Sequence, residues 1–414
     1  MNHPLFVGVD PHRKKNVVQM MDSQGERLGD TLRVDNNQPG TAALIKHLME
    51  TAASGEFDGI RIATEATGWY WLHFFQALHQ ELAASPWPVA LYALNPRLTA
   101  KFKQTYVDLD KNDAIDAYVV TDRLRMGRDL PQPFRQDDIY LPLRFLTRFR
   151  RRVVTNLARE KTYFLSALYL KASEYTRQDK QPFSNVFGAT SRAVIQEFAS
   201  FEEIAAIPFD DLVAYIDIKG KHRFLDPAEN ARRLRQVAAD SYPLPETWQE
   251  PVNTILRLSL QQIAALQRQE QRLNTAIAEH MAAIPHTLDT IPGIGPVCSA
   301  GIIAEIAGVQ RFHYDQAKVA KYAGLRWRHS GSGDFQAEDT PLSRAGNAHL
   351  RYYLCEAANI VRLHDADYKA FYQRKFHEVR KHRHKRAIVL TARKLVRLVV
   401  RLLTTNQPYR PRRP

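Results

Sequence analysis

Four acidic residues in the first third of the chain have the type and spacing that divalent cations require. Asp10 and Glu65 each directly follow a short apolar run, and Asp113 and Asp116 are three residues apart. On a helix, that spacing puts both side chains on one face. Gathered carboxylates repel one another unless cations neutralise them, and hard oxygen ligands favour Mg²⁺ or Mn²⁺. Two such ions about 3.5–4 Å apart can activate the attacking and leaving oxygens of phosphoryl transfer. The alternative is that the four acids are scattered over the surface.

Two glycine-containing segments nearer the C-terminus hold further candidates. In IPGIGPV, Gly293 and Gly295 permit close backbone approach, and the helix start that follows can bind a phosphate. A tight structural turn is the alternative. In RHSGSGDF, Ser330 and Ser332 lie beside glycines. A serine hydroxyl is a weak nucleophile until a base or metal takes its proton, so these residues alone indicate only a flexible loop.

Positive charge is concentrated at the C-terminal end of the sequence. The chain of 414 residues has 58 Lys and Arg against 44 Asp and Glu, a net charge of +14. Residues 374–414 hold 14 Lys or Arg and one acid, Glu378. Such an excess points to a polyanion, most often nucleic acid. The residues predicted to contact nucleic acid are Gly293, Gly295, Arg326, Arg328, Arg344, Arg351, Arg386, Arg393 and Arg397. A basic amphipathic helix on a membrane surface is the alternative for the C-terminal segment.

The composition excludes several classes of protein. Hydrophobic residues make up 44% and charged residues 25%, which is a globular balance and excludes disorder throughout. Two cysteines, Cys298 and Cys355, are too few for a disulfide framework and fit a reducing cytosol. The sequence shows neither a signal peptide nor an uninterrupted apolar stretch of about 18 residues. We therefore expect a cytoplasmic protein without a membrane partner.

The candidate acids need a scaffold, and the hydrophobic pattern predicts an α/β region over residues 1–130. Three strands should be followed by helix, strand, helix, strand and helix, which is an α/β order. The expected strands are 5–9, 16–22, 27–34, 59–64 and 88–94, and the expected helices are 40–52, 70–84 and about 110–127.

Residues 144–285 are predicted to be mainly helical. Asp226 is an expected N-cap with Glu229 three residues later, which is the spacing of a capping box. From 252 to 284 apolar residues recur at three- and four-residue spacing, and Ser259, Glu270 and His280 interrupt this seam. Either a coiled-coil partner helix or a long helix packed on its own domain accounts for the pattern.

The order of the motifs resembles that of the DEDD insertion-sequence transposases, which are bridge-RNA-guided serine recombinases. The segments that carry the resemblance are VGVDPHRKKNV, ATEATGWYW, NP followed by KNDAIDA, IPGIGPVCSAGIIAEI, YAGL, SGDF and LSRAGNAHLRYYL. They cover roughly residues 1–127 and 286–403, and the middle of the chain resembles the family only in being helical.

The resemblance implies three regions. Residues 1–143 would form a RuvC-like catalytic domain of RNase H-like fold, and residues 144–285 a helical coiled-coil oligomerisation region. Residues 286–414 would form a mainly helical transposase domain with the serine loop and a basic C-terminal helix.

The resemblance also assigns site residues. The four metal-binding acids of the family match Asp10, Glu65, Asp113 and Asp116. The family commonly has K-T-D before the helix acids, and Asn112 stands here in place of the threonine. The family's nucleophilic serine follows A-G-L, and counting from that segment favours Ser332 over Ser330.

These matches imply a Mg²⁺-dependent transposase and site-specific DNA recombinase. Its partners would be donor and target DNA, a guide non-coding RNA encoded by the element, and further copies of the chain in a homodimer or homotetramer. It would act on the nucleoid of a bacterium through a covalent phosphoserine–DNA intermediate. Two other hypotheses stay open: a RuvC-like structure-specific nuclease that uses water as nucleophile, and a non-catalytic nucleic-acid-binding scaffold.

Overall fold

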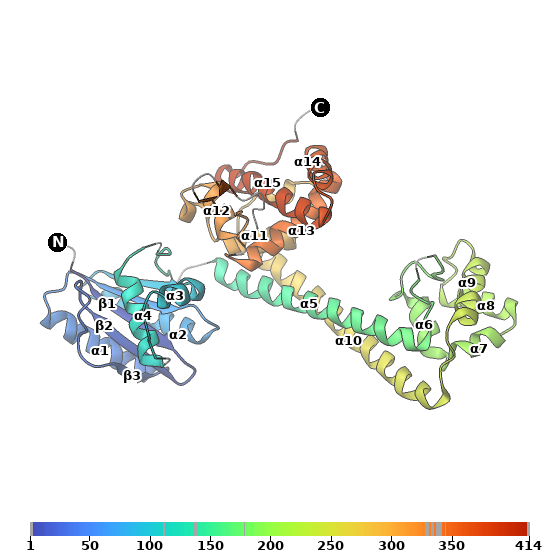
Figure 1. The fold of residues 1–414 in the computed structure, drawn as a ribbon, viewed down its shortest axis with the longest axis horizontal. Coiled ribbons are helices and arrows are strands. Elements are labelled where there is room, and N and C mark those ends of the chain that lie inside the picture. Colours follow the sequence, from blue (N-terminus) through green and yellow to red (C-terminus); the bar gives the residue numbers. More distant parts are fainter. Residues whose placement is uncertain are drawn as a thin grey trace. The chain divides into compact units, whose positions relative to one another are not determined.

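The computed structural model describes residues 3–110, 112–128, 130–135, 139–177, 179–327, 331–332, 335–336, 342–343 and 345–411, with backbone alone for 331–332 and 335–336. Contacts divide the chain into two compact units, Met1–Asp138 and Ile139–Pro414 (Figure 1). Each unit is described by itself below. The division into three regions stays a prediction.

The N-terminal unit is built on a sheet of five strands. Its strands are β1 (Leu5–Pro11), β2 (Lys15–Met21), β3 (Leu32–Asp35), β4 (Ile60–Glu65) and β5 (Val89–Leu94). They lie in the order β3-β2-β1-β4-β5. β2 is antiparallel to β1 and β3, whereas β1, β4 and β5 are parallel. The carboxyl ends of β1 and β4 therefore lie side by side at one edge of the sheet.

Helices cover both faces of this sheet. They are α1 (Gln38–Ser54), α2 (Tyr70–Glu81), α3 (Pro96–Lys103) and α4 (Asp113–Arg125), with a 3-10 turn, η1 (Leu82–Ala84), after α2. Leu5, Val7 and Val9 of β1 share a core with α1 and α2 on one face. Phe6 shares a second core with α4 on the other face (Figure 1). Alternation along a strand therefore points Phe6, Gly8 and Asp10 toward the α4 side.

Gly8 lets α4 approach β1 closely. A Cβ atom on Gly8 would lie 2.6 Å from the carbonyl oxygen of Ala117 and would overlap the backbone and hydroxyl of Thr121. Real Cβ atoms do not approach other atoms so closely, so glycine is required for this packing. The start of α4 is thereby held against the strand that ends in Asp10.

The predicted α/β order is confirmed, with differences at element boundaries. The strand expected over 27–34 is limited to β3, and only an isolated bridge joins Arg27 to Met21, because a bend at Gly29 and Asp30 interrupts the extended chain. The helix expected over 70–84 ends at Glu81, and its last three residues form η1. The sequence analysis missed α3, which follows its cap residue Asn95.

The second unit begins with a long helix, α5 (Tyr140–Lys171), which packs along α10 (Glu246–Met281). Two of the three residues that interrupt the seam of α10 meet polar residues of α5, and the third, His280, is exposed. Ser259 donates to Oε1 of Glu160 at 2.6 Å, and Glu270 accepts from Nη2 of Arg150 at 2.6 Å. The seam is thus covered by a helix of its own unit, which favours the second of the two interpretations.

Four shorter helices share a core with these two. They are α6 (Ala189–Glu197), α7 (Phe201–Ala206), α8 (Phe209–Lys219) and α9 (Pro227–Asp240). Asp226 caps α9 as predicted, accepting from the Glu229 amide at 2.9 Å. In a capping box the Glu229 carboxylate would accept from the backbone amide of Asp226. It pairs instead with Arg232 and Arg233 of its own helix.

A second helical core lies toward the C-terminus. Its elements are η2 (Leu288–Thr290), α11 (Pro296–Ile306), η3 (Val309–Phe312), α12 (Gln316–Tyr322), the strands β6 (Gly331–Ser332) and β7 (Phe335–Gln336), α13 (Ala348–His364), α14 (Ala366–His377) and α15 (Arg383–Thr405). Ala392, Leu395 and Val399 of α15 are buried in this core together with α11 and α13. The apolar face that a membrane surface would need is therefore already occupied. Among the described residues, no helix combines the length and apolar character of a membrane span.

Candidate active site

The sheet places two of the four acids side by side. β1 and β4 are parallel neighbours whose register pairs Val9 with Thr64. Asp10 and Glu65 are the next residue on each strand, and alternation puts both side chains on the face covered by α4. Both carboxylates are half-buried.

The first turn of α4 supplies the other two acids. Asn112 caps this helix, and its Oδ1 accepts from the Ile115 amide at 2.9 Å. Asparagine and threonine both cap helices well. Asn112 can therefore replace the threonine of the K-T-D pattern without loss of the N-cap of α4. Asp113 and Asp116 lie in the first turn, where the helix dipole favours negative charge.

Asp10, Glu65, Asp113 and Asp116 gather into one acid cluster. Burial raises the pKa of Asp10; His12 opposes this shift, and the charges of Asp116 and Asp113 add to it. Burial likewise raises the pKa of Glu65, and the charges of Asp10 and Asp116 add to that shift. Asp10 therefore lies close enough to Asp113 and Asp116 to feel their charges, and Glu65 lies close enough to Asp10 and Asp116 to feel theirs.

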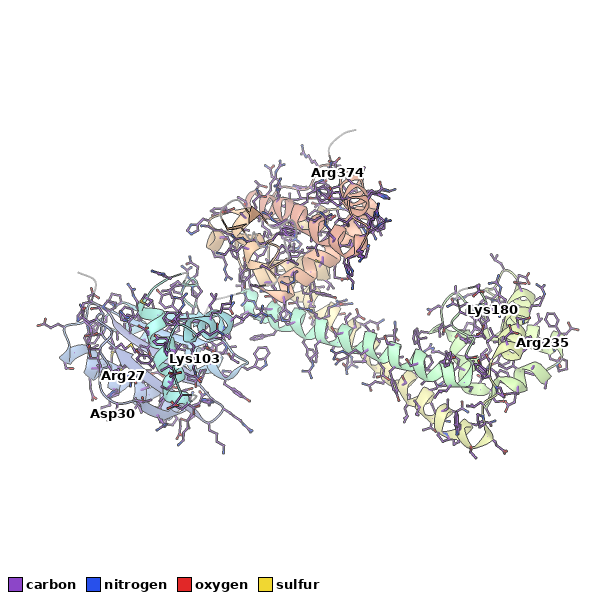
Figure 2. All side chains as sticks on the ribbon, in the orientation of Figure 1. Arg27, Asp30, Lys103, Lys180, Arg235 and Arg374 are labelled. Atoms are coloured by element: carbon purple, nitrogen blue, oxygen red, sulfur yellow. The ribbon has the colours of Figure 1, made fainter. Side chains whose placement is uncertain are left out.

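His12 joins two of the acids. Its Nε2 lies 3.0 Å from Oδ2 of Asp10 and 3.5 Å from Oδ1 of Asp113. One potential ligand atom from each of these three residues lies within 4.8 Å of the others, a spacing that one metal ion can bridge. Lys103, labelled in Figure 2, donates to Oδ1 of Asp116 at 2.6 Å.

The chemistry of this donor set fits a divalent cation. Burial and mutual repulsion both disfavour the charged forms of Asp10 and Glu65, and a bound cation offsets both effects. Carboxylate oxygens are the ligands that Mg²⁺ and Mn²⁺ prefer, and the His12 nitrogen adds a ligand that Mn²⁺ accepts.

The serine loop belongs to the second unit. Ser332 lies in β6, paired with Phe335 of β7, and the structure gives the backbone position of this residue. At the base of the loop Trp327 pairs with Leu342, and the Ser343 amide donates to the Arg326 carbonyl at 2.8 Å. The predicted site residues Ser330, Arg328 and Arg344 lie outside the described residues.

The two glycines of the predicted phosphate-binding turn differ. Gly293 has a φ of +89°, and a Cβ there would lie 2.8 Å from Ile360 and 2.9 Å from His364 of α13. Packing against α13 therefore accounts for Gly293. Gly295 is the N-cap residue of α11, and a Cβ there would meet open space. Of the two positions, the backbone near Gly295 is the one that a phosphate can approach.

The predicted nucleic-acid-binding arginines differ in their surroundings. Arg326, Arg386 and Arg397 are exposed. Arg351 donates to the Ala323 carbonyl at 3.0 Å, and Arg386 to Glu378 at 3.0 Å. Arg393 is half-buried, and burial together with the charge of Arg397 lowers its pKa. Phosphate contact stays a prediction for all five.

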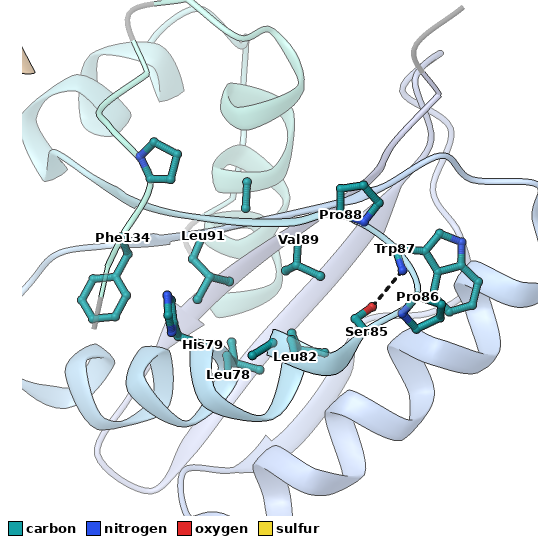
Figure 3. Close-up of a pocket in the computed structure, with 13 residues that line it drawn as sticks. Leu78, His79, Leu82, Ser85, Pro86, Trp87, Pro88, Val89, Leu91 and Phe134 are labelled. Atoms are coloured by element: carbon teal, nitrogen blue, oxygen red, sulfur yellow. Dashed lines mark hydrogen bonds between the residues drawn. The ribbon is translucent and has the colours of Figure 1, made fainter. Parts of the chain in front are cut away.

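A pocket of about 460 Å³ lies between α2 and β5 (Figure 3). Its lining is mainly apolar and includes Leu78, Trp87 and Phe134. None of the four acids is among the described residues that line it. The pocket is therefore separate from the acid cluster.

Sequence analysis missed His12 and Lys103. His12 follows Asp10 by two residues, and this Asp-x-His spacing was a usable signal. Lys103 had no signal, because its contact with Asp116 depends on α3, which was not predicted.

Comparison with known proteins adds independent findings. Residues 7–171 match the model of the DEDD transposases of IS110 type, described as a transposase. Residues 285–373 match the model described as the transposase IS116/IS110/IS902 family. Together the two matches cover more than half of the chain. The chain is also 23% identical over 421 residues to the insertion element IS900 uncharacterized 42 kDa protein of Mycobacterium paratuberculosis, covering 99% of this chain and 98% of that protein.

Proposed function

Because the chain belongs to the IS110 family of insertion-sequence transposases, which process DNA, we propose that its acid cluster binds Mg²⁺ or Mn²⁺ and catalyses phosphoryl transfer on DNA. The observation that carries this proposal is the convergence of Asp10, Glu65, Asp113 and Asp116 from β1, β4 and α4. The sheet order, with an antiparallel β2 beside three parallel strands, supports an RNase H-like, RuvC-like domain.

The proposed roles follow from where each side chain lies. Asp10, Glu65, Asp113 and Asp116 would hold the metal, which when bound polarises the scissile phosphate and stabilises the leaving oxygen. His12 orients two of these carboxylates by contacting both. Lys103 holds Asp116 in the cluster until a cation arrives.

Ser332 is the proposed nucleophile. Its Oγ would attack phosphorus, a phosphorus–oxygen bond of the DNA strand would break, and a phosphoserine–DNA bond would form. Because that bond conserves the energy of the phosphodiester, strand exchange would need no ATP. The support is its place in the serine loop of the family resemblance, in the segment whose backbone forms β6.

Paired serine variants test this role. Ser332→Ala should abolish the protein–DNA adduct on a denaturing gel, whereas Ser330→Ala should retain it. The reverse pattern would move the nucleophile to Ser330. Metal-dependent cleavage by the unaltered protein without any adduct would favour the second candidate, a RuvC-like nuclease that uses water. That candidate is supported by the fact that all four acids lie in one unit, without the serine loop.

A guide RNA and self-association complete the proposal. The protein would recognise nucleic-acid shape and backbone while base pairing reads sequence, as in other RNA-guided systems. Exposed apolar side chains on the long helices, among them Tyr163, Tyr169 and Leu258, support contact between copies of the chain. By resemblance, the acid cluster and the serine loop of one active site would come from different protomers of a tetramer.

Two measurements on the purified protein test these partners. Sequencing of co-purified RNA should return one discrete species encoded beside the gene. Light scattering should give a dimer or tetramer, and a monomer both with and without RNA would contradict this part of the proposal.

Two aromatic side chains extend the proposed DNA site. Trp69 and Tyr70 follow Glu65 by four and five residues, and they are 60% and 52% exposed. Asn36 ties this segment to the acid cluster region, since its Nδ2 donates to the carbonyl oxygens of His12 at 2.8 Å and Tyr70 at 3.1 Å. Exposed aromatic rings stack on nucleobases with little dependence on sequence, so both fit a strand held at the acids.

A further inference from the structure

A fully buried carboxylate lies in the second unit, apart from the chemistry proposed above. Glu305, in the last turn of α11, has no exposed surface. Arg148 of α5 binds it with two hydrogen bonds, Nε to Oε1 at 2.7 Å and Nη2 to Oε2 at 2.8 Å. Burial by itself would raise the pKa of Glu305, but the bonds and charge of Arg148, with help from Asn347 and Arg144, hold it below the usual range. The carboxylate is therefore charged and fixed.

Asn347 connects this carboxylate to two further elements. Its Nδ2 donates to Oε2 of Glu305 at 2.6 Å and to the hydroxyl of Tyr322 at 3.1 Å. Its Oδ1 accepts from the amides of His349 and Leu350 at 2.9 and 3.0 Å, which caps α13. All the hydrogen-bonding capacity of the side-chain amide is thus used, so it holds a single orientation.

These contacts lie at the loop neck, by which we mean residues 322–327 together with 342–343 and 345–347. The Asn347 amide donates to the Tyr322 carbonyl at 2.6 Å, which brings the two ends of the serine loop together. Farther along the loop, the Ser343 amide donates to the Arg326 carbonyl, and Trp327 pairs with Leu342. Both chain segments leading to Ser332 therefore start from backbone that Asn347 fixes.

We propose that Arg148, Glu305 and Asn347 form an anchor that positions the loop neck, and through it the serine loop, for DNA cleavage. This inference rests on the proposed function of that loop. The three side chains are positioning residues, since they act through the neck. Such an ion pair is weak support for stability, but it is suited to fixing one arrangement, because the fully buried Glu305 carboxylate cannot exchange its partners for water.

Substitutions at Asn347 separate anchoring from helix capping. Asn347→Ser keeps an N-cap oxygen for α13, because serine caps helices about as well as asparagine, but it removes both Nδ2 donors. Asn37→Ser is the matched control, since Asn37 caps α1 through Oδ1, which accepts from the Gly40 amide at 2.9 Å. Both variants should melt close to the unaltered protein.

Two measurements on the full chain with Mg²⁺ and its DNA then test whether Asn347 anchors the loop neck. Hydrogen exchange of the amides in 342–350 should be at least about tenfold faster in Asn347→Ser than in Asn37→Ser. The single-turnover rate of cleavage should fall about tenfold in Asn347→Ser, with DNA affinity unchanged. Equal exchange and equal cleavage rates in the two variants would overturn the inference.

A double variant that exchanges the carboxylate and the amide between positions 305 and 347 distinguishes loss of the anchor from loss of folding. Asn347→Asp keeps the cap but places a carboxylate against Glu305, and it should slow cleavage. Adding Glu305→Gln supplies an amide donor to Asp at 347 and should recover part of the rate, whereas failure to recover would count against the anchor. If the unaltered protein forms no serine adduct, the proposed function fails, and the exchange measurement still decides whether the anchor holds the neck.

Discussion

Asp10 and Glu65 in the N-terminal unit and Glu305 in the second unit are all withdrawn from water, yet their pKa values move in opposite directions. Burial raises the pKa of Asp10 and of Glu65, and neighbouring acids raise them further. Glu305 is the more deeply buried, but Arg148 and Asn347 bring its pKa below the usual range. In the acid cluster the cation of Lys103 pairs with Asp116 alone, whereas the anchor pairs its one buried carboxylate with Arg148 within the fold.

The opposite pKa shifts distinguish a carboxylate suited to bind a cation from a carboxylate that stabilises the fold. Burial alone does not separate them, because both kinds are withdrawn from water. The sign of the pKa shift does, because it reports whether the charged form already has its partner.

Neutralising the acid cluster should have the largest effect. Asp10→Asn should lower the rate of metal-dependent DNA cleavage by about 10³-fold or more, because a metal supplies several kcal/mol of charge stabilisation in phosphoryl transfer. Asp30→Asn, at an exposed acid of the same unit, is the control and should keep the rate. A variant Asp10→Asn that cleaves normally would remove the cluster from the chemistry.

Breaking the anchor should act on stability instead. Arg148→Met removes the two hydrogen bonds and the nearer cation of buried Glu305, leaves it with Arg144 at 4.0 Å, and should cost about 3 kcal/mol of unfolding free energy, measured by urea denaturation. The double variant Arg148→Met, Glu305→Leu should recover most of that loss. In the unaltered protein the contribution of Glu305 is complete above its unfolded pKa of about 4.5 and is lost as pH falls through its lower folded pKa. The cost of Arg148→Met should therefore shrink in acid.

Metal and pH should both change the stability that the acid cluster contributes to the fold. In chelator, the pKa values raised in the folded state make Asp10 and Glu65 bind protons more tightly there, so their contribution to stability should increase as pH falls through those values. Mg²⁺ at a hundred times its dissociation constant should stabilise the protein by about 2.7 kcal/mol at neutral pH. Calorimetry on Asp10→Asn should show a much smaller increase; an equal one would place the ion elsewhere.

The aromatic side chains beside the acids should give the smallest effect. Trp69→Ala should weaken binding of single-stranded DNA by about 1 kcal/mol, the lower end of the range for base stacking. Trp69→Phe keeps an aromatic ring and should lose less. Fluorescence titration measures both, and equal affinity for all three proteins would exclude stacking at this position.

The parts of the acid cluster that depend on local sequence patterns were predictable. Asp10 and Glu65 follow short apolar runs that indicate strands, and Asp113 and Asp116 have helical spacing. The parallel pairing of β1 and β4, which joins the first two, was implied by the alternating order of elements. Lys103 was out of reach, because α3 is short and lacks a strong apolar pattern.

The anchor was not predictable, because its residues are far apart in sequence. Arg148 and Glu305 are 157 residues apart, and Arg148 lies in a run of basic residues that looks like an exposed surface. The same difficulty affected Ser259 and Glu270, which look like defects in an apolar seam until α5 supplies their partners. Local periodicity shows which face of a helix is apolar, but it does not identify the residue that will meet a buried charge.

Gly8 carries no reactive atom, yet the proposed chemistry depends on it. Adding one methyl group there would force α4 outward and carry Asp113 and Asp116 with it, so the cluster would come apart while each of its carboxylates remained intact. Some copies of an insertion element accumulate mutations and lose activity. A copy in which this glycine is replaced would still look functional if only the four acids were inspected. The residue to inspect first, when sorting live copies from dead ones, is therefore the glycine two positions before the first aspartate.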